Sequence, residues 1–186
     1  NIALNGVDVG RFRKTGRGAM ATRDLDVGEI VVSVPDGMVL TSETSAARAR
    51  LEAFVGEEDV GSPRLEKELL VMAVMAEMCA GEKSKWGSYL RVVYDGAMSG
   101  HSVLAWTDEE CARLAGTDTW RDAYERDDDE TLDLPTMTDE HWENVVEVFF
   151  EQNPELMGEL DVKDLRELHF AATAMVAGYS FTLGDD

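Results

Sequence analysis

The sequence predicts an α+β fold in which a small β-rich N-terminal portion is followed by a larger, predominantly helical lobe. Strand signals lie within residues 1–41, where the β-branched run from Ile30 to Val34 stops at Pro35 and predicts a buried strand. From residue 42 onward, apolar residues recur at three- and four-residue spacing, which is typical of amphipathic helices. At 186 residues with 44% hydrophobic content, the chain is long enough to bury a sizeable core.

The β-rich portion is organised around Gly16-Arg17-Gly18, which stands ahead of the short apolar run 19–21. Two glycines flanking one residue let the backbone turn tightly and approach a ligand closely. We interpret the region as strand, turn and strand with a glycine loop at its mouth, and Gly28-Glu29 as a second turn. A dinucleotide fingerprint is excluded, because there is no third glycine and a strand follows instead of a helix. A hairpin loop without a ligand stays open as the plainer interpretation.

Helix signals divide the remaining chain. Thr41-Ser42 predicts a cap, and one central helix runs from Arg64 to about Gly81. Its expected apolar face is Leu65, Leu69, Val71, Met72, Val74, Met75, Met78 and Cys79. Thr107-Asp108-Glu109-Glu110 has the spacing of a capping box.

Two further helices are expected near the C-terminus. Thr138 is predicted to cap the first, which Asn153-Pro154 stops, and Asp161 to cap the last. The expected apolar residues are Trp142, Val145, Val146, Phe149 and Phe150 in the first, and Leu165, Leu168, Ala172, Met175, Val176 and Tyr179 in the last.

The chain is strongly acidic, with 17 Lys and Arg against 38 Asp and Glu and a formal net charge of −21. Such a surface repels nucleic acid and anionic membranes and attracts basic partners. No apolar run is long enough to span a bilayer. The basic residues Arg11, Arg13, Lys14, Arg17 and Arg23 gather near the glycines.

Other reaction classes find little support in the sequence. The run Asp127–Glu130 is interpreted as solvated surface, and there is no nucleophile elbow, P-loop or zinc signature. No metal site is expected, and none of the histidines at 101, 141 and 169 forms a catalytic constellation. Cys79 and Cys111 are interpreted as buried thiols of a protein in a reducing, intracellular compartment, with nucleus, cytoplasm and plastid left open.

Several segments in order resemble the SET domain of protein lysine methyltransferases. They are Gly16-Arg17-Gly18-Ala19-Met20-Ala21-Thr22-Arg23-Asp24-Leu25, Gly28-Glu29, Val34-Pro35, Lys85-Trp86-Gly87-Ser88-Tyr89-Leu90, Ala105-Trp106 with Leu114-Ala115-Gly116-Thr117, and Ala177-Gly178-Tyr179-Ser180-Phe181. They are similar to the branch with a helical insertion, typified by the Rubisco large-subunit and RelA methyltransferases. Gly178-Tyr179 stands where many relatives have Ser-Arg, which places the chain nearer the RelA type.

The resemblance implies a division into N-terminal SET strands at 1–41, a helical insertion at 42–160 and a helix returning to the SET core at 161–186. It implies S-adenosylmethionine as cofactor, a protein substrate with a target lysine in a basic segment, and the following sites. Thr15, Gly16, Arg17, Gly18 and Tyr179 would contact the cofactor, and Trp86, Ser180 and Phe181 would border the substrate lysine. For Trp86 a core-anchor role is the plainer alternative.

The family's Asn-His motif and catalytic tyrosine have no counterpart before Asp186. We therefore expect no catalytic residue in this chain, and a fragment that is inactive alone while its parent protein methylates a non-histone protein. Two alternatives stay open: a non-catalytic acidic helical module that binds basic protein segments, and a protein histidine methyltransferase of the same architecture. The sequence does not name the substrate.

Overall fold

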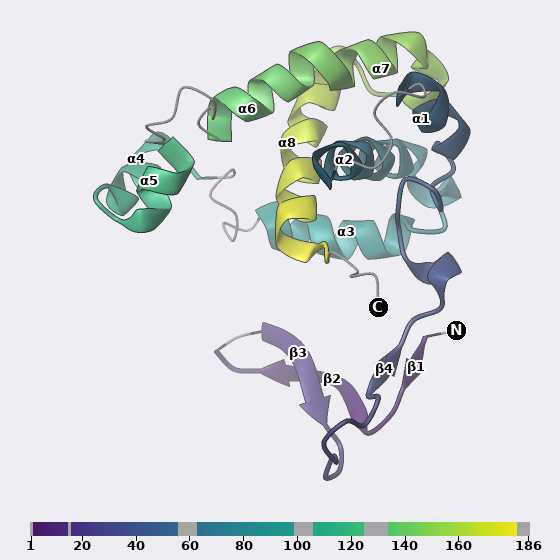
Figure 1. Cartoon of the computed structure of the whole chain (residues 1–186), viewed down its shortest axis with the longest axis vertical. Helices are drawn as coiled ribbons and strands as arrows, with labels where there is room; N and C mark the ends of the chain where they lie inside the picture. Colours follow the sequence, from purple (N-terminus) through teal and green to yellow (C-terminus); the bar gives the residue numbers. More distant parts are fainter. Residues whose placement is uncertain (1, 15, 56–62, 99–105, 125–133, 182–186) are drawn as a thin grey trace. The chain divides into compact units, whose positions relative to one another are not determined.

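The computed structural model describes residues 2–14, 16–55, 63–98, 106–124 and 134–181. The chain forms two compact units, residues 1–40 and residues 41–186 (Figure 1). The first contains all the strands of the described residues, and the second contains the long helices. The predicted α+β class with helix dominant is therefore confirmed.

The first unit consists of two antiparallel ribbons. Strand β2 (Val7–Phe12) pairs with β3 (Gly16–Ala21) as a hairpin, and the two-residue strand β1 (Ala3–Leu4) pairs with β4 (Val32–Ser33). A short 3₁₀ turn, Asp36–Met38, follows. Each ribbon has only two strands, a size that is marginally stable on its own in water.

The predicted buried strand from Ile30 to Val34 is wrong in length and in burial. Only Val32 and Ser33 are paired, and Ile30 is 72% exposed and Val32 47% exposed. The reason is that their partner strand has just two residues, and no second layer within the ribbon covers the β-branched side chains. A β-branched run therefore signalled extended backbone correctly without ensuring burial.

The second unit is built on helix α2 (Pro63–Ala80), which packs against α8 (Val162–Tyr179) and α3 (Gly87–Gly96); α3 also contacts α8 (Figure 1). The other α-helices are α1 (Arg48–Val55), α4 (Asp108–Cys111), α5 (Asp118–Tyr124), α6 (Leu134–His141) and α7 (Glu147–Gln152). A π-helical segment, Trp142–Val146, joins α6 to α7. Short 3₁₀ turns lie at Gly81–Lys83, Ala112–Leu114 and Pro154–Leu156. In the described part of the chain, no helix combines the length and the apolar character needed to cross a membrane.

The core of the second unit follows the predicted helix faces. Met72 and Met75 of α2 are completely buried, as are Phe149 of α7 and Ala172 of α8. All of residues 71–77 are buried, so the middle of α2 is enclosed on every side instead of along one stripe. This enclosure explains why Val71 and Val74 join the core beside the methionines.

Two of the four predicted helix caps are confirmed. Asp161 caps α8 by accepting a 2.9 Å hydrogen bond from the Asp164 amide, and the Thr107 amide donates to Glu110 Oε2 at 3.0 Å, as a capping box requires. Helix α7 ends at Gln152, before Asn153.

Two predicted helix starts are wrong. Thr138 lies inside α6, which begins four residues earlier at Leu134, and its side chain is buried. The side chains of Thr41 and Thr44 bond each other's amides in a separate turn, so α1 begins only at Arg48. At Thr41, the hydroxyl that could cap a helix instead accepts a hydrogen bond within its own turn.

A buried carboxylate connects three helices. Glu77 of α2 is 2% exposed and accepts hydrogen bonds from Ser45 Oγ at 2.8 Å and from the Ala46 amide at 2.6 Å. Its other oxygen accepts from Ser84 Oγ. Since Ser45 precedes α1 and Ser84 precedes α3, one side chain fixes the starts of both helices against α2.

Candidate functional site

The predicted glycine loop is a strand. Gly16 and Gly18 lie in β3, with Gly16 opposite Phe12 and Gly18 opposite Gly10 in the hairpin register. Thr15 lies outside the described residues. The loop prediction was wrong for Gly18, which lies within the ladder with β2, whereas Gly16 keeps a positive φ of 76° at the end of the hairpin where the chain turns into β3. Two glycines in a sequence do not by themselves choose between turn and strand.

The two glycines of the motif differ in what surrounds them. Gly16 has φ +76°, and nothing lies within 4 Å of where a Cβ would stand, so its backbone is open on that side. A Cβ at Gly18 would lie 3.3 Å from a carbon of the Phe12 ring. The same ring lies close to Gly10, which is paired with Gly18. The Phe12 side chain therefore covers the Gly10–Gly18 pair, where neither residue has a side chain of its own.

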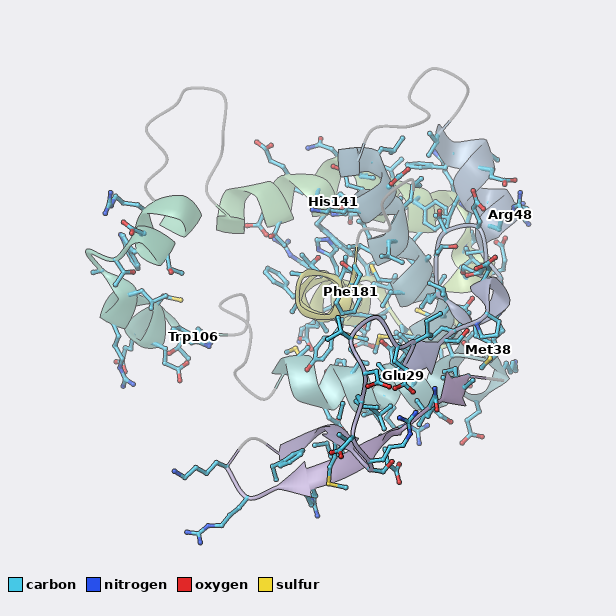
Figure 2. The ribbon with its side chains drawn as sticks, turned by 60° about the horizontal axis from the view of Figure 1, so that its bottom comes forward. Glu29, Met38, Arg48, Trp106, His141 and Phe181 are labelled. Carbon is cyan, nitrogen blue, oxygen red and sulfur yellow. The ribbon has the colours of Figure 1, made fainter. Side chains whose placement is uncertain are left out.

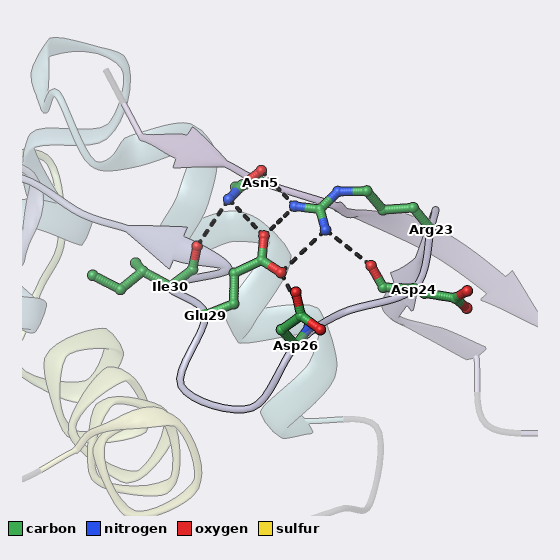
Figure 3. A network of polar contacts seen from close by, with 6 residues as sticks. All are labelled: Asn5, Arg23, Asp24, Asp26, Glu29 and Ile30. Atoms are coloured by element: carbon green, nitrogen blue, oxygen red, sulfur yellow. Dashed lines mark hydrogen bonds and ion pairs between the residues drawn. The ribbon is translucent and has the colours of Figure 1, made fainter.

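A polar network closes the loop that follows β3 (Figure 3). Glu29 receives hydrogen bonds from the Arg23 guanidinium, from Asn5 Nδ2 at 3.0 Å and from the Asp26 amide at 3.2 Å. Arg23 also donates to Asn5 Oδ1 at 2.9 Å and to the Asp24 carbonyl at 2.9 Å. The guanidinium therefore fixes both ends of residues 23–30 to the chain between β1 and β2.

This network holds Glu29 ionised. The hydrogen bonds from Arg23, followed by that from the Asp26 amide, lower the pKa of Glu29 to about 2, against the opposing effect of desolvation. The pKa of Arg23 is raised by the same pair. Sequence reasoning named Arg23 only as a basic residue and Glu29 only as a turn residue. The sequence did contain a signal for this ion pair: an arginine and a glutamate stand six residues apart with a turn glycine between them.

The sequence Tyr179-Ser180-Phe181 stands where α8 ends. Tyr179 is the last helical residue, and the Ser180 amide donates to the Val176 carbonyl at 3.1 Å. Phe181 is 89% exposed at the end of the helix (Figure 2), and Tyr179 is 42% exposed. Tyr179 and Phe181 are thus accessible to a ligand.

Tyr179 lies against helix α3. Its hydroxyl oxygen is 2.5 Å from the position that a Cβ on Gly96 would occupy, so glycine at 96 makes room for the ring. Burial, followed by the nearby Tyr179, raises the pKa of Tyr89, also on α3. Of the predicted cofactor contacts, residues 16–18 belong to the first unit and Tyr179 to the second, so a shared pocket stays a prediction.

Trp86 belongs to the core of the helical unit. It is 7% exposed, its amide donates to Ser84 Oγ at 3.0 Å, and Lys85 Nζ stands 4.6 Å from the centre of its ring. Burial and the cation over one ring face favour the core-anchor role. A contact with a substrate lysine stays a prediction.

Two of the three histidines meet in the core. His141 Nδ1 lies 3.0 Å from His169 Nε2, and His169 is completely buried. Burial, followed by the neighbouring His141, lowers the pKa of His169 to about 3. His101 lies outside the described residues. The described residues contain no group of three or more histidine, cysteine, aspartate or glutamate side chains able to hold a metal ion.

The chain is similar to a curated human protein, "SET domain-containing protein 4". The two are 32% identical over 83 residues, which is 44% of this chain and 18% of the human protein. No protein-family profile and no solved structure matches the chain. The similarity supports a relationship to SET-domain proteins, and the chain spans less than a fifth of that relative.

Proposed function

We propose that this chain is part of a protein lysine N-methyltransferase that uses S-adenosylmethionine and acts on a non-histone protein. The observation that carries the proposal is the 32% identity over 83 residues to a SET domain-containing protein. The ordered motifs from Gly16 to Phe181 add to it, and they favour the branch with a helical insertion.

The residues present fit the cofactor in part. The open backbone at Gly16 and the half-exposed ring of Tyr179 are suited to contact a polar and aromatic ligand. Gly18 fits less well on the face that Phe12 covers, so its contact would have to come from the other face or from its backbone edge. When bound, S-adenosylmethionine supplies an electrophilic methyl group on a sulfonium.

This chain's residues would position the cofactor and the substrate. Gly16, Arg17 and Gly18 would hold the cofactor along β3, while Ser180 and Phe181 would border the target side chain. A lysine must lose its proton before transfer, against an ordinary pKa of about 10.4. We assign no described residue to that step.

The acidity of the helical unit supports a basic substrate segment. Residues 1–40 hold five basic and five acidic residues, so the entire net charge of −21 belongs to residues 41–186. The same observation favours the second candidate, a non-catalytic module that binds basic segments. Such a module needs the charge and does not need the cofactor.

The test is transfer of a tritiated methyl group from S-adenosylmethionine onto a protein lysate. We expect labelling by a longer chain extended past Asp186 and none by the 186 residues alone. Hydrolysis of the labelled product should yield methyllysine, and methylhistidine would instead support the histidine alternative. If the longer chain neither labels protein nor binds S-adenosylmethionine, the non-catalytic module that binds basic segments is the remaining candidate.

A paired substitution locates the cofactor contact in the longer protein. Gly18→Val should weaken S-adenosylmethionine binding in calorimetric titration, because a branched side chain crowds the motif. Gly37→Val is the control, since Gly37 lies in the same unit with nothing within 4 Å of its Cβ position. If both variants fold and bind S-adenosylmethionine with equal affinity, the assignment of β3 as a cofactor contact is contradicted.

A further inference from the structure

The end of the β2–β3 hairpin is the basic part of an acidic chain. Arg11, Arg13, Lys14 and Arg17 lie within seven residues, and we call them the basic hairpin end. No acidic residue stands between Asp8 and Asp24. All four cations are exposed, and side chains ending in nitrogen extend from this turn in Figure 2.

The strand register sets two of these cations against each other. Arg11 is directly opposite Arg17, so both side chains extend from the same face of the hairpin. Side chains directly opposite have Cβ atoms about 5 Å apart, and like charges there destabilise the pair. This repulsion lowers the stability of the hairpin, and the hairpin does not need arginine at both positions in order to form.

No carboxylate among the described residues relieves this repulsion. Elsewhere in the chain, arginines form ion pairs: Arg23 with Glu29, Arg48 with Glu52, Arg50 with Glu155, Arg121 with Asp118 and Arg166 with Asp139. None of the four cations of the basic hairpin end forms an ion pair with a described residue. In a chain with 38 acidic residues, this leaves a cationic surface open to an external anion.

The same hairpin face continues as an apolar surface. Side chains alternate between the two faces of a strand, so Val9 and Ala19, which are paired, share the face of Arg11 and Arg17. Val9 is 67% exposed, and Ala19 is exposed as well. The face therefore presents exposed apolar side chains directly beside two guanidinium groups.

We propose that this face binds an acidic segment of a partner protein whose apolar residues adjoin its carboxylates. Arginine is suited to carboxylates because its planar fork donates two parallel hydrogen bonds. Long polyanions and anionic bilayers fit poorly, because they extend beyond the hairpin and meet the repulsion of a −21 chain. A short acidic segment neutralises the four cations without that penalty. The proposal does not depend on methyl transfer.

The first experiment measures binding of a fluorescent peptide, in which Glu alternates with Leu, to the 186-residue chain by anisotropy. Arg11→Gln with Arg17→Gln should raise the Kd about fivefold to thirtyfold, equivalent to two ion pairs of about 0.5–1 kcal/mol each. The matched control is Arg48→Gln with Arg50→Gln, which removes the same charge from arginines that are exposed and already paired. We expect less than a twofold change there.

A single charge reversal gives an independent readout. Arg11→Glu replaces the like-charged pair with an attractive one, so amide exchange in β2 and β3 should slow while peptide affinity falls. Faster exchange would show that the two arginines stabilise the hairpin and would contradict the argument. The proposal is also overturned if both double variants weaken binding equally, or if a Gln-Leu peptide binds as well. Tighter binding to an oligonucleotide or to phosphatidylserine vesicles would assign the surface to those ligands instead.

Discussion

A side chain at Gly6 would meet both a backbone and a steric obstacle. Its φ is +68°, and a Cβ there would lie 2.6 Å from a methyl carbon of Leu25 and 2.8 Å from the guanidinium carbon of Arg23. Gly6→Ala should therefore strain the backbone and also displace Arg23 from Glu29 and Asn5.

Gly28→Ala is the matched comparison, because Gly28 has φ +85° but open space around its Cβ position. We expect Gly28→Ala to cost about 1 kcal/mol from backbone strain alone and Gly6→Ala at least about 2 kcal/mol. Amide hydrogen exchange across residues 3–33 measures the loss of stability in each variant. Equal losses would show that the packing of Arg23 over Gly6 contributes nothing.

His169 makes stability depend on pH in a defined direction. Its pKa is about 3 in the folded chain, against 6.5 ordinarily. Between these values the unfolded chain binds a proton that the folded chain does not, so the free energy of unfolding falls as pH falls. His141 lies against it, and Arg166 lowers and Asp139 raises its pKa.

The measurement is urea unfolding of the natural chain and His169→Gln at pH 7 and pH 4. Glutamine is polar but does not titrate. Between pH 7 and pH 4, the free energy of unfolding of the natural chain should therefore fall by about 3 kcal/mol more than that of the variant. Carboxylate titration affects both proteins alike and cancels in the comparison. Parallel losses would contradict a buried neutral His169.

At the scale of elements, Glu77 of α2 holds the starts of two other helices, α1 and α3. Glu77→Ala leaves the Ser45 hydroxyl and Ala46 amide without their acceptor and should lower the free energy of unfolding by about 2–5 kcal/mol. Glu77→Gln should cost less, because its amide oxygen still accepts a hydrogen bond. The exposed Glu82, beside α2, provides the control, with a change within about 0.5 kcal/mol for Glu82→Ala.

Urea unfolding followed by circular dichroism would compare the three variants. A loss below 1 kcal/mol for Glu77→Ala would mean that α1 and α3 do not depend on this carboxylate. Glu77 was not identified from the sequence, although a glutamate within the apolar run 69–80 is unusual. Its partners, 32 and 7 residues away, were not visible.

At the scale of the molecule, the two units differ in what holds them together. Buried apolar side chains run from Ala47 to Val176, whereas Gly10 is the one buried residue among those described in 1–40. We therefore predict that residues 41–186 expressed alone unfold cooperatively with a helical spectrum, and that residues 1–40 alone do not fold. Loss of the cooperative transition on removing residues 1–40 would contradict this.

The sequence by itself determined the features that depend on near neighbours. The fold class, the apolar face of α2, the Asp161 cap and the capping box at Thr107 and Glu110 were all predictable. Each rests on hydrogen bonds or on a spacing that repeats within a few residues, so the chain order contains the necessary information.

Only the tertiary structure decided the features that depend on distant partners. Pairing with β2 made Gly16 and Gly18 strand residues, and the short partner β1 left Val32 exposed. The Arg23–Glu29–Asn5 network and the His141–His169 contact likewise join residues separated by turns or by whole helices. A polar side chain has several possible partners along the chain, and the packing of the folded chain selects which of them comes within hydrogen-bonding distance.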